Sequence, residues 1–122
     1  MKERKLWKVQ EHAFVQQDLI FKLTHSFPRD ELYGVTSQIR RSSRSVGANL
    51  AEAYRKSDYP QHLILKLTDA DAENSETAYW LSVCIGCEYC SPSQIANILD
   101  INSQIGRLLH YMKHNPTKFT YK

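Results

Sequence analysis

The sequence predicts an all-α protein, an up-down-up-down antiparallel four-helix bundle. The 122-residue chain holds only 4 Gly and 4 Pro, a composition that suits long helices better than many short strands. Apolar residues recur at helical spacing in four segments of about twenty residues, which short turns connect. Strand-like alternation is nearly absent. At this length we expect one domain over residues 1–122.

The first helix is expected over residues 3–25. Its apolar side chains recur every seven residues in two adjacent rows, which predicts a wide buried face. Phe27 precedes Pro28, and a residue before proline resists helical geometry, so the helix should end there. The rows are Leu6, Ala13, Ile20 and Phe27, and Trp7, Phe14 and Phe21.

The second helix is expected over residues 28–56, with Ser43 breaking its apolar stripe. Gly34 and Gly47 each weaken a helix by about 1 kcal/mol relative to alanine, so we expect a bend or an interruption at one of them. The core stripe is Leu32, Val35, Ile39, Val46, Leu50 and Ala53.

The third helix is expected over residues 58–88, capped by Ser57 or Asp58. The fourth is expected over residues 92–114, because Ser91, Pro92 and Gln94 form a capping box with proline at the first helical position. Asn115 and Pro116 then end it, leaving a tail over residues 115–122. The two stripes are Leu63, Leu67, Ala70, Asn74, Leu81 and Cys84 or Ile85, and Ile95, Ile98, Asn102, Ile105, Leu109 and Met112.

Charge is distributed unevenly. Residues 28–56 carry six basic and three acidic side chains, whereas residues 57–90 carry one and six. Four arginines of the second helix share the face opposite its core stripe: Arg40, Arg41, Arg44 and Arg55. They could grip phosphates of RNA or DNA. Alternatively, they could pair with carboxylates of another subunit, a reading that the small residues Ala48 and Ala51 on that face favour. The candidate carboxylates are Asp69, Asp71, Glu73 and Glu76.

Polar residues beside the apolar stripes suggest a structural hydrogen-bond network, because a partly buried polar group needs partners. Its candidates are Asn49, Glu52 and Glu76, with Asn74 inside a stripe.

No catalytic constellation is recognisable, so we expect a protein that is not an enzyme and has no cofactor. Cys84, Cys87 and Cys90 are spaced C-x2-C-x2-C, but on a helix they fan out too widely for one metal ion. We expect them to be small apolar side chains rather than a metal site. His110 and His114 fit the end of a helix better than a zinc site. A charged N-terminus and the lack of a long apolar run favour a cytoplasmic protein without a membrane partner.

The run from Tyr33 to Asp58 resembles the signature of the 23S rRNA intervening-sequence proteins, four-helix bundles once called S23 ribosomal proteins. The preceding FPRDE and the later SETAYWLSVCIGCEY are also similar to segments of that family, and the resemblance covers about residues 5 to 115. Three positions depart from its pattern: Gly47 replaces a proline, Ala53 a glycine and Ala78 a glutamate. The matching residues are Gly34, Thr36, Ser37, Gln38, Ile39, Arg40, Arg41, Ser45, Asn49, Ala51 and Glu52.

The resemblance implies a homo-oligomer, typically a homopentamer. The chain is more distantly similar to the accessory variability proteins of diversity-generating retroelements, which are basic pentamers that bind nucleic acid. The leading hypothesis is therefore a non-enzymatic oligomer that binds RNA or DNA through the arginines of the second helix. The alternative is a structural or adaptor oligomer whose arginines form salt bridges between subunits and which binds a protein partner.

Overall fold

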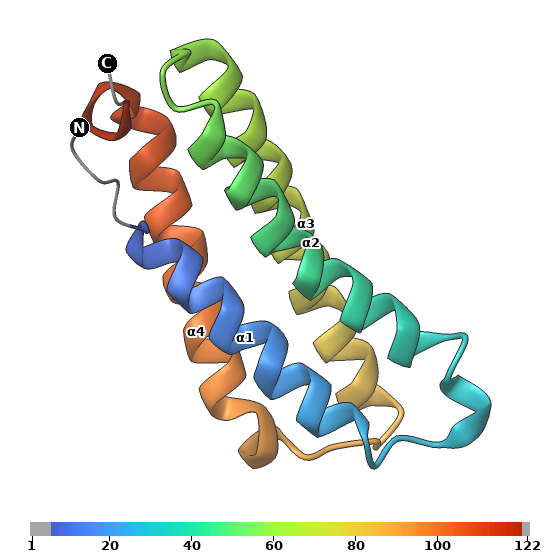
Figure 1. The fold of residues 1–122 in the computed structure, drawn as a ribbon. Coiled ribbons are helices and arrows are strands. Elements are labelled where there is room, and N and C mark those ends of the chain that lie inside the picture. The colour runs from blue at the N-terminus through green and yellow to red at the C-terminus, as the bar shows by residue number, and fades with distance from the viewer. Residues whose placement is uncertain (1–5, 121–122) are drawn as a thin grey trace.

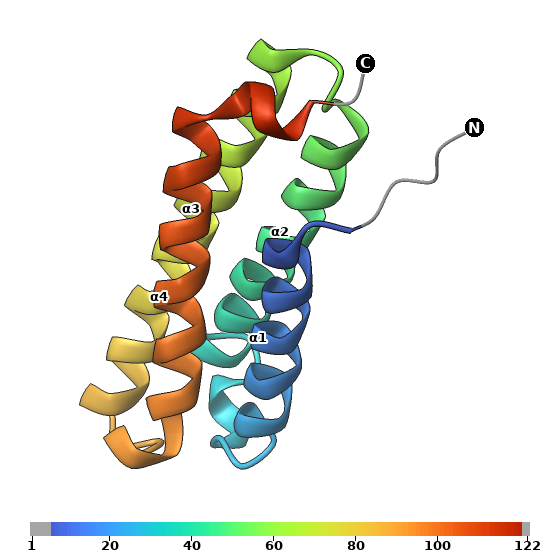
Figure 2. The same ribbon diagram turned by 90° about the vertical axis from the view of Figure 1, so that its left-hand side faces the viewer.

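The computed structural model describes residues 6–120, and these form four antiparallel α-helices (Figures 1 and 2). α1 packs against α2 and α4, and α3 packs against the same two helices, so the bundle has a square cross-section. No β-strand occurs in residues 6–120, and the predicted four-helix bundle is confirmed. The elements are α1 (Lys8–Thr24), the 3₁₀ turn η1 (Arg29–Glu31), α2 (Val35–Arg55), α3 (Pro60–Gly86), α4 (Pro92–His114) and the 3₁₀ turn η2 (Pro116–Phe119).

Helix α2 begins at Val35, so the expected start at residue 28 is wrong. The chain first makes η1, and Gly34 occupies the position before the helix. A Cβ at Gly34 would lie 2.3 Å from Oε1 of Glu31, whose other carboxylate oxygen accepts a hydrogen bond from the Tyr89 hydroxyl at 2.6 Å. The expected interruption is therefore at Gly34, and α2 continues through Gly47 without a break.

The other helix ends depart less from expectation. α1 begins at Lys8 after the cap residue Trp7, and the first expected residues, 3–5, lie outside the described part of the chain. α3 begins at Pro60 after Tyr59, not after Ser57 or Asp58, because a proline ring already has the φ of a first helical residue. α4 has the expected bounds. The tail turns back as η2 and contacts α3 and α4.

The core consists of two apolar halves. Ala13 and Ile20 of α1 belong to different halves, as do Ile39 and Val46 of α2. Each helix has polar residues between its two apolar groups. One half contains Trp7, Val9, Ala13, Val46, Leu50, Ala53, Leu63, Leu67, Ala70, Ile105, Leu109 and Met112, and the other contains Ile20, Phe27, Val35, Ile39, Leu81, Cys84, Cys90, Ile95 and Ile98.

A central polar layer separates these halves, and its members are Gln16, Ser42, Asn74, Thr77 and Asn102. Asn74 and Asn102 each donate to the other's backbone carbonyl at 3.0 Å, which joins α3 to α4. Gln16 of α1 accepts from Asn102 at 2.9 Å and donates to Asn74 at 3.3 Å. Ser42 and Thr77 share a hydrogen bond of 2.8 Å between α2 and α3. Because a slip of one helix would break these bonds, the layer sets the register of the bundle.

The apolar face of α1 is narrower than its two rows predict. Trp7, Ala13, Ile20 and Phe27 are buried. Leu6, Phe14 and Phe21 instead remain exposed by 65%, 66% and 38% of their surfaces. The second row thus leaves two phenylalanine rings on the outside of the bundle, two turns apart on α1.

Candidate functional site

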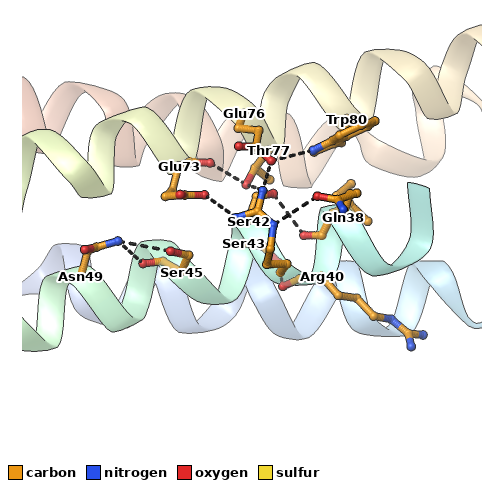
Figure 3. A network of polar contacts seen from close by, with 12 residues as sticks. Gln38, Arg40, Ser42, Ser43, Ser45, Asn49, Glu73, Glu76, Thr77 and Trp80 are labelled. Atoms are coloured by element: carbon orange, nitrogen blue, oxygen red, sulfur yellow. Dashed lines mark hydrogen bonds and ion pairs between the residues drawn. The ribbon is translucent and has the colours of Figure 1, made fainter. Parts of the chain in front are cut away.

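Arg41 lies on the side of α2 that faces α3, and its charge is balanced within the chain. Its guanidinium contacts Glu73 at 3.1 Å and forms a second ion pair with Glu76. Its Nε donates to Oε1 of Gln38 at 3.2 Å. The same Glu76 carboxylate accepts a hydrogen bond of 2.9 Å from the Trp80 indole, as Figure 3 shows. Glu73 and Glu76 were among the expected partners, and the pairing seen here lies inside one chain.

Arg40 and Arg44 turn to the opposite side of α2, toward α1. Arg40 donates from Nε to the Thr24 hydroxyl at 2.8 Å, and its guanidinium carbon lies 4.7 Å from the centre of the Phe21 ring. The guanidinium of Arg44 lies 5.5 Å from the same ring centre. In Figure 3 the Arg40 side chain points away from the cluster around Glu76. Such cation–π contacts stabilise by about 0.5–1 kcal/mol at exposed sites.

Arg55 occupies a third place, in the last turn of α2. A cation there is favourable because the C-terminus of a helix carries partial negative charge. At 1.5 Å per residue, it lies about 20 Å along the helix from Arg40 and Arg41. Arg55 therefore lies apart from the other three arginines of the expected ridge, which together line one groove on α2 although their guanidiniums turn to different neighbours.

A shallow groove of about 700 Å³ follows the outer side of α2. A smaller hollow of about 300 Å³ lies beside it, between the end of α1 and the start of α2, and both are lined by Leu32, Thr36 and Arg40. The Thr36 hydroxyl is buried and has no hydrogen-bond partner among residues 6–120. Tyr33 borders the groove and is 92% exposed. We call this surface the α1–α2 face. Its residues are Phe21, Leu32, Tyr33, Thr36, Arg40, Arg44 and Ala48, which line the two hollows, together with Phe14, which lies two turns before Phe21 on α1.

The expected polar network of Asn49, Glu52 and Glu76 does not form. Among residues 6–120, Asn49 donates only to Ser45, one turn earlier, at 2.9 and 3.2 Å, and this pair lies apart from the Glu76 cluster in Figure 3. Glu52 instead forms a 2.9 Å ion pair with Lys66 of α3. A hydrogen bond and charge from Lys66 lower the pKa of Glu52, and the same pair raises the pKa of Lys66.

The polar contacts that do form a network are those of the central layer, of which Gln16, Ser42 and Thr77 were not foreseen. Two signals in the sequence indicate Gln16. Asn74 and Asn102 occupy core positions of their stripes, and Gln16 lies between the buried Ala13 and Ile20 on α1. A polar side chain at a core position of each of three helices indicates a shared buried layer.

The cysteines do not form a metal site in the described part of the chain, where no group of three potential ligands converges. Burial raises the pKa of Cys84 to about 12 and also raises the pKa of Cys90, so both are held as thiols rather than as the thiolates that bind metals. Cys87 is exposed. The rings of His110 and His114 are 4.2 Å apart, and His114 contacts the backbone carbonyl of His110 at 2.8 Å.

Comparison with known proteins identifies the family of the chain. A model of the family described as 23S rRNA-intervening sequence protein matches residues 5–111. The chain belongs to this family. This confirms the resemblance to the 23S rRNA intervening-sequence proteins that its motif indicates.

A solved structure supports the assignment to the 23S rRNA-intervening sequence family. It is the crystal structure of a protein with unknown function from the S23 ribosomal protein family of Bacteroides thetaiotaomicron VPI-5482. The two chains are 29% identical, and the TM-score is 0.75 over 86% of this chain and 97% of that one. A search of curated proteins found no match. None of the helices in residues 6–120 has the length and hydropathy needed to cross a membrane.

Proposed function

We propose that this protein is a non-catalytic assembly protein that associates with further copies of itself through the α1–α2 face. The expected subunit number is five, from the family resemblance. In this proposal the oligomer is a scaffold, and its subunits contact one another through the α1–α2 face.

The observation that carries the proposal is the placement of Arg40 and Arg44 over the exposed Phe21 ring, beside an open and mostly apolar groove. Aromatic residues and arginine are the types that are enriched at protein interfaces, where lysine and glutamate are depleted. Phe14 and Tyr33 extend this surface with large exposed rings. The buried Thr36 hydroxyl beneath the groove lacks a partner among residues 6–120, and a polar group from another subunit would satisfy it.

Charge complementarity supports a second copy of this chain as the partner that binds the α1–α2 face. Arg40 and Arg44 have no ion pair with a carboxylate in residues 6–120, and residues 57–90 carry six acidic side chains against one basic one. Asp69 on α3 is exposed, and its one ion pair among residues 6–120 is a long one of 3.8 Å to Lys66. A carboxylate of the next subunit can therefore bind the edge of a guanidinium whose face is covered by Phe21.

Nucleic-acid binding is the second candidate function. Arg44 and Arg55 are exposed, and neither forms an ion pair with another described residue. Both remain open to phosphates of RNA or DNA, the ligand that the arginines of the second helix were first expected to bind. In an assembled ring Arg55, which lies outside the proposed contact, would recur once per subunit, and this repetition strengthens binding to a long anionic chain.

Light scattering on the purified protein at tens of micromolar tests the proposal. The monomer has a mass of 14.2 kDa, so a homopentamer is expected at about five times that value. A mass of one chain across this range would contradict self-assembly. Fluorescence anisotropy with labelled RNA and DNA, repeated at rising salt, tests the second candidate, because binding to phosphates must weaken steeply with salt.

A further inference from the structure

A second groove, between α1 and α4, is lined by basic side chains. Its volume is about 250 Å³, and its lining residues are Lys8, His12, Gln104, Arg107 and Leu108. No carboxylate is among them. Lys8 and His12 are one turn apart on α1, so they lie on the same side of that helix. Arg107 approaches from α4.

The basic side chains of this groove differ from several others in the bundle. Lys22, Arg41, Lys66 and Lys113 each form an ion pair with a carboxylate. In residues 6–120, Lys8, His12 and Arg107 form neither an ion pair nor a hydrogen bond through their side chains. Their donors are therefore available to an external anion.

The carboxylates nearest in sequence to the basic residues of this groove either bind other side chains or do not line the groove. Asp100 accepts a 2.7 Å hydrogen bond from the Gln104 side chain. Asp71, which lines the neighbouring groove between α3 and α4 with Arg107, is bound to Lys113 at 2.9 Å. Glu11 is exposed in the first turn of α1 and does not line the groove. Lys8 is also the first residue of a 17-residue helix, whose N-terminal amides favour an anion.

We infer that the α1–α4 groove is a binding site for a phosphate group, held by Lys8, His12 and Arg107. Arg107 supplies a planar guanidinium that can bind two phosphate oxygens, and Lys8 supplies a point charge from the other wall. The phosphate can belong to a nucleic-acid backbone or to free inorganic phosphate. The site is separate from the proposed subunit contact, because Phe21 faces α2 from the other side of α1.

The test is an amide NMR titration of the full-length protein with inorganic phosphate at constant ionic strength. Saturable shifts are expected on the amides of residues 8–12 and 104–108, with a dissociation constant on the order of millimolar. The double variant Lys8→Ala, Arg107→Ala should weaken this binding by about tenfold or more. Both side chains are exposed, so the variant should fold, which circular dichroism checks.

The matched control is Arg29→Ala, Lys56→Ala, which removes the same charge from two exposed sites elsewhere. It should bind phosphate as the unmodified protein does. The inference is overturned if the amide shifts do not saturate, or if the control variant loses as much phosphate affinity as the double variant.

Anisotropy with a labelled single-stranded RNA then identifies the source of the phosphate. If RNA affinity falls in the double variant Lys8→Ala, Arg107→Ala but not in the control variant, the site is upheld and the phosphate belongs to a nucleic-acid backbone. Unchanged RNA affinity with lost phosphate binding upholds the site and assigns it to free phosphate.

Discussion

The central polar layer and the α1–α2 face both place polar or charged side chains beside large apolar ones, but only the layer is complete within the chain. Each side chain of the layer forms a hydrogen bond with another member, within the trio of Gln16, Asn74 and Asn102 or within the pair of Ser42 and Thr77. On the α1–α2 face, Phe14 is exposed, Tyr33 is almost fully exposed, and the buried hydroxyl of Thr36 has no partner among residues 6–120.

Residues of the central polar layer therefore stabilise the fold, whereas residues of the α1–α2 face indicate contact with a partner. Arg41 and Arg40 are adjacent in sequence, yet Arg41 is paired with carboxylates of α3 and Arg40 lies over an aromatic ring of α1. Substitutions inside the layer should therefore change stability, and substitutions on the face should change assembly.

The largest effect is expected for Asn74→Ala. It removes the reciprocal bonds with Asn102, leaves Gln16 without its acceptor and opens a small cavity. We expect the free energy of unfolding to fall by about 2–4 kcal/mol, as measured by urea denaturation at fixed protein concentration. The exposed Asn97→Ala on the same bundle is the control and should change stability by less than about 0.5 kcal/mol. Equal values for the two variants would show that the layer does not stabilise the fold.

A somewhat smaller effect is expected for Phe14→Ser, and it should appear in assembly rather than in stability. Removing an exposed ring that becomes buried in the contact should weaken each subunit contact by about 1.5–3 kcal/mol. Sedimentation velocity should show dissociation at concentrations where the unmodified protein is assembled. Phe14→Leu keeps an apolar side chain and should remain mostly assembled. If Phe14→Ser is assembled to the same extent, Phe14 does not lie in the contact.

Arg41→Ala and Arg44→Ala compare the two sides of α2 directly. Loss of Arg41 should reduce stability by about 1 kcal/mol or less, because its ion pairs with Glu73 and Glu76 are partly exposed to solvent. Loss of Arg44 should leave stability nearly unchanged and weaken assembly. Thermal unfolding and light scattering on both variants measure the two effects. The opposite result, in which Arg44→Ala lowers stability and Arg41→Ala weakens assembly, would show that these two arginines do not have the roles assigned to them.

The smallest effect concerns the pair of Glu52 and Lys66. Lys66 holds the pKa of Glu52 below 4.5, so the folded state favours the charged carboxylate. The stability from this pair is present above pH 4.5 and is lost as the pH falls through the lowered pKa. In Lys66→Met, a carboxyl NMR titration should find the pKa of Glu52 closer to its ordinary value. An unchanged pKa would show that the ion pair is not populated.

Most of the fold follows from the sequence because its signals are local. Apolar spacing, the proline after Phe27 and the capping box at Ser91 depend on neighbours within a few residues. The start of α2 was predicted wrongly because it depends on Glu31, which is held in place by Tyr89. Heptad spacing also does not reveal which of two adjacent rows faces the core, and so Phe14 and Phe21 were expected to be buried.

The candidate site was less predictable, because long side chains reach neighbours that are distant in sequence. A helical projection placed four arginines on one face, but it gives only the direction in which each side chain starts. Arg41 contacts Glu73 and Glu76, which are 32 and 35 residues away. The rings beside Arg40 and Arg44 come from α1. These contacts depend on how the helices pack, which the spacing of one helix does not determine.

The reactivity of a thiol placed inside the proposed contact tests directly whether the α1–α2 face joins the subunits. The variant Ala48→Cys, made in a protein that carries Cys87→Ser, puts a thiol in the groove of α2, where Ala48 is exposed in the single chain. Its rate of labelling is compared in the assembled protein and in the same protein with Phe14→Ser. If the α1–α2 face is the subunit contact, labelling is slow in the assembly and fast after dissociation. Fast labelling in a protein whose measured mass is that of an oligomer would show that the subunits meet elsewhere.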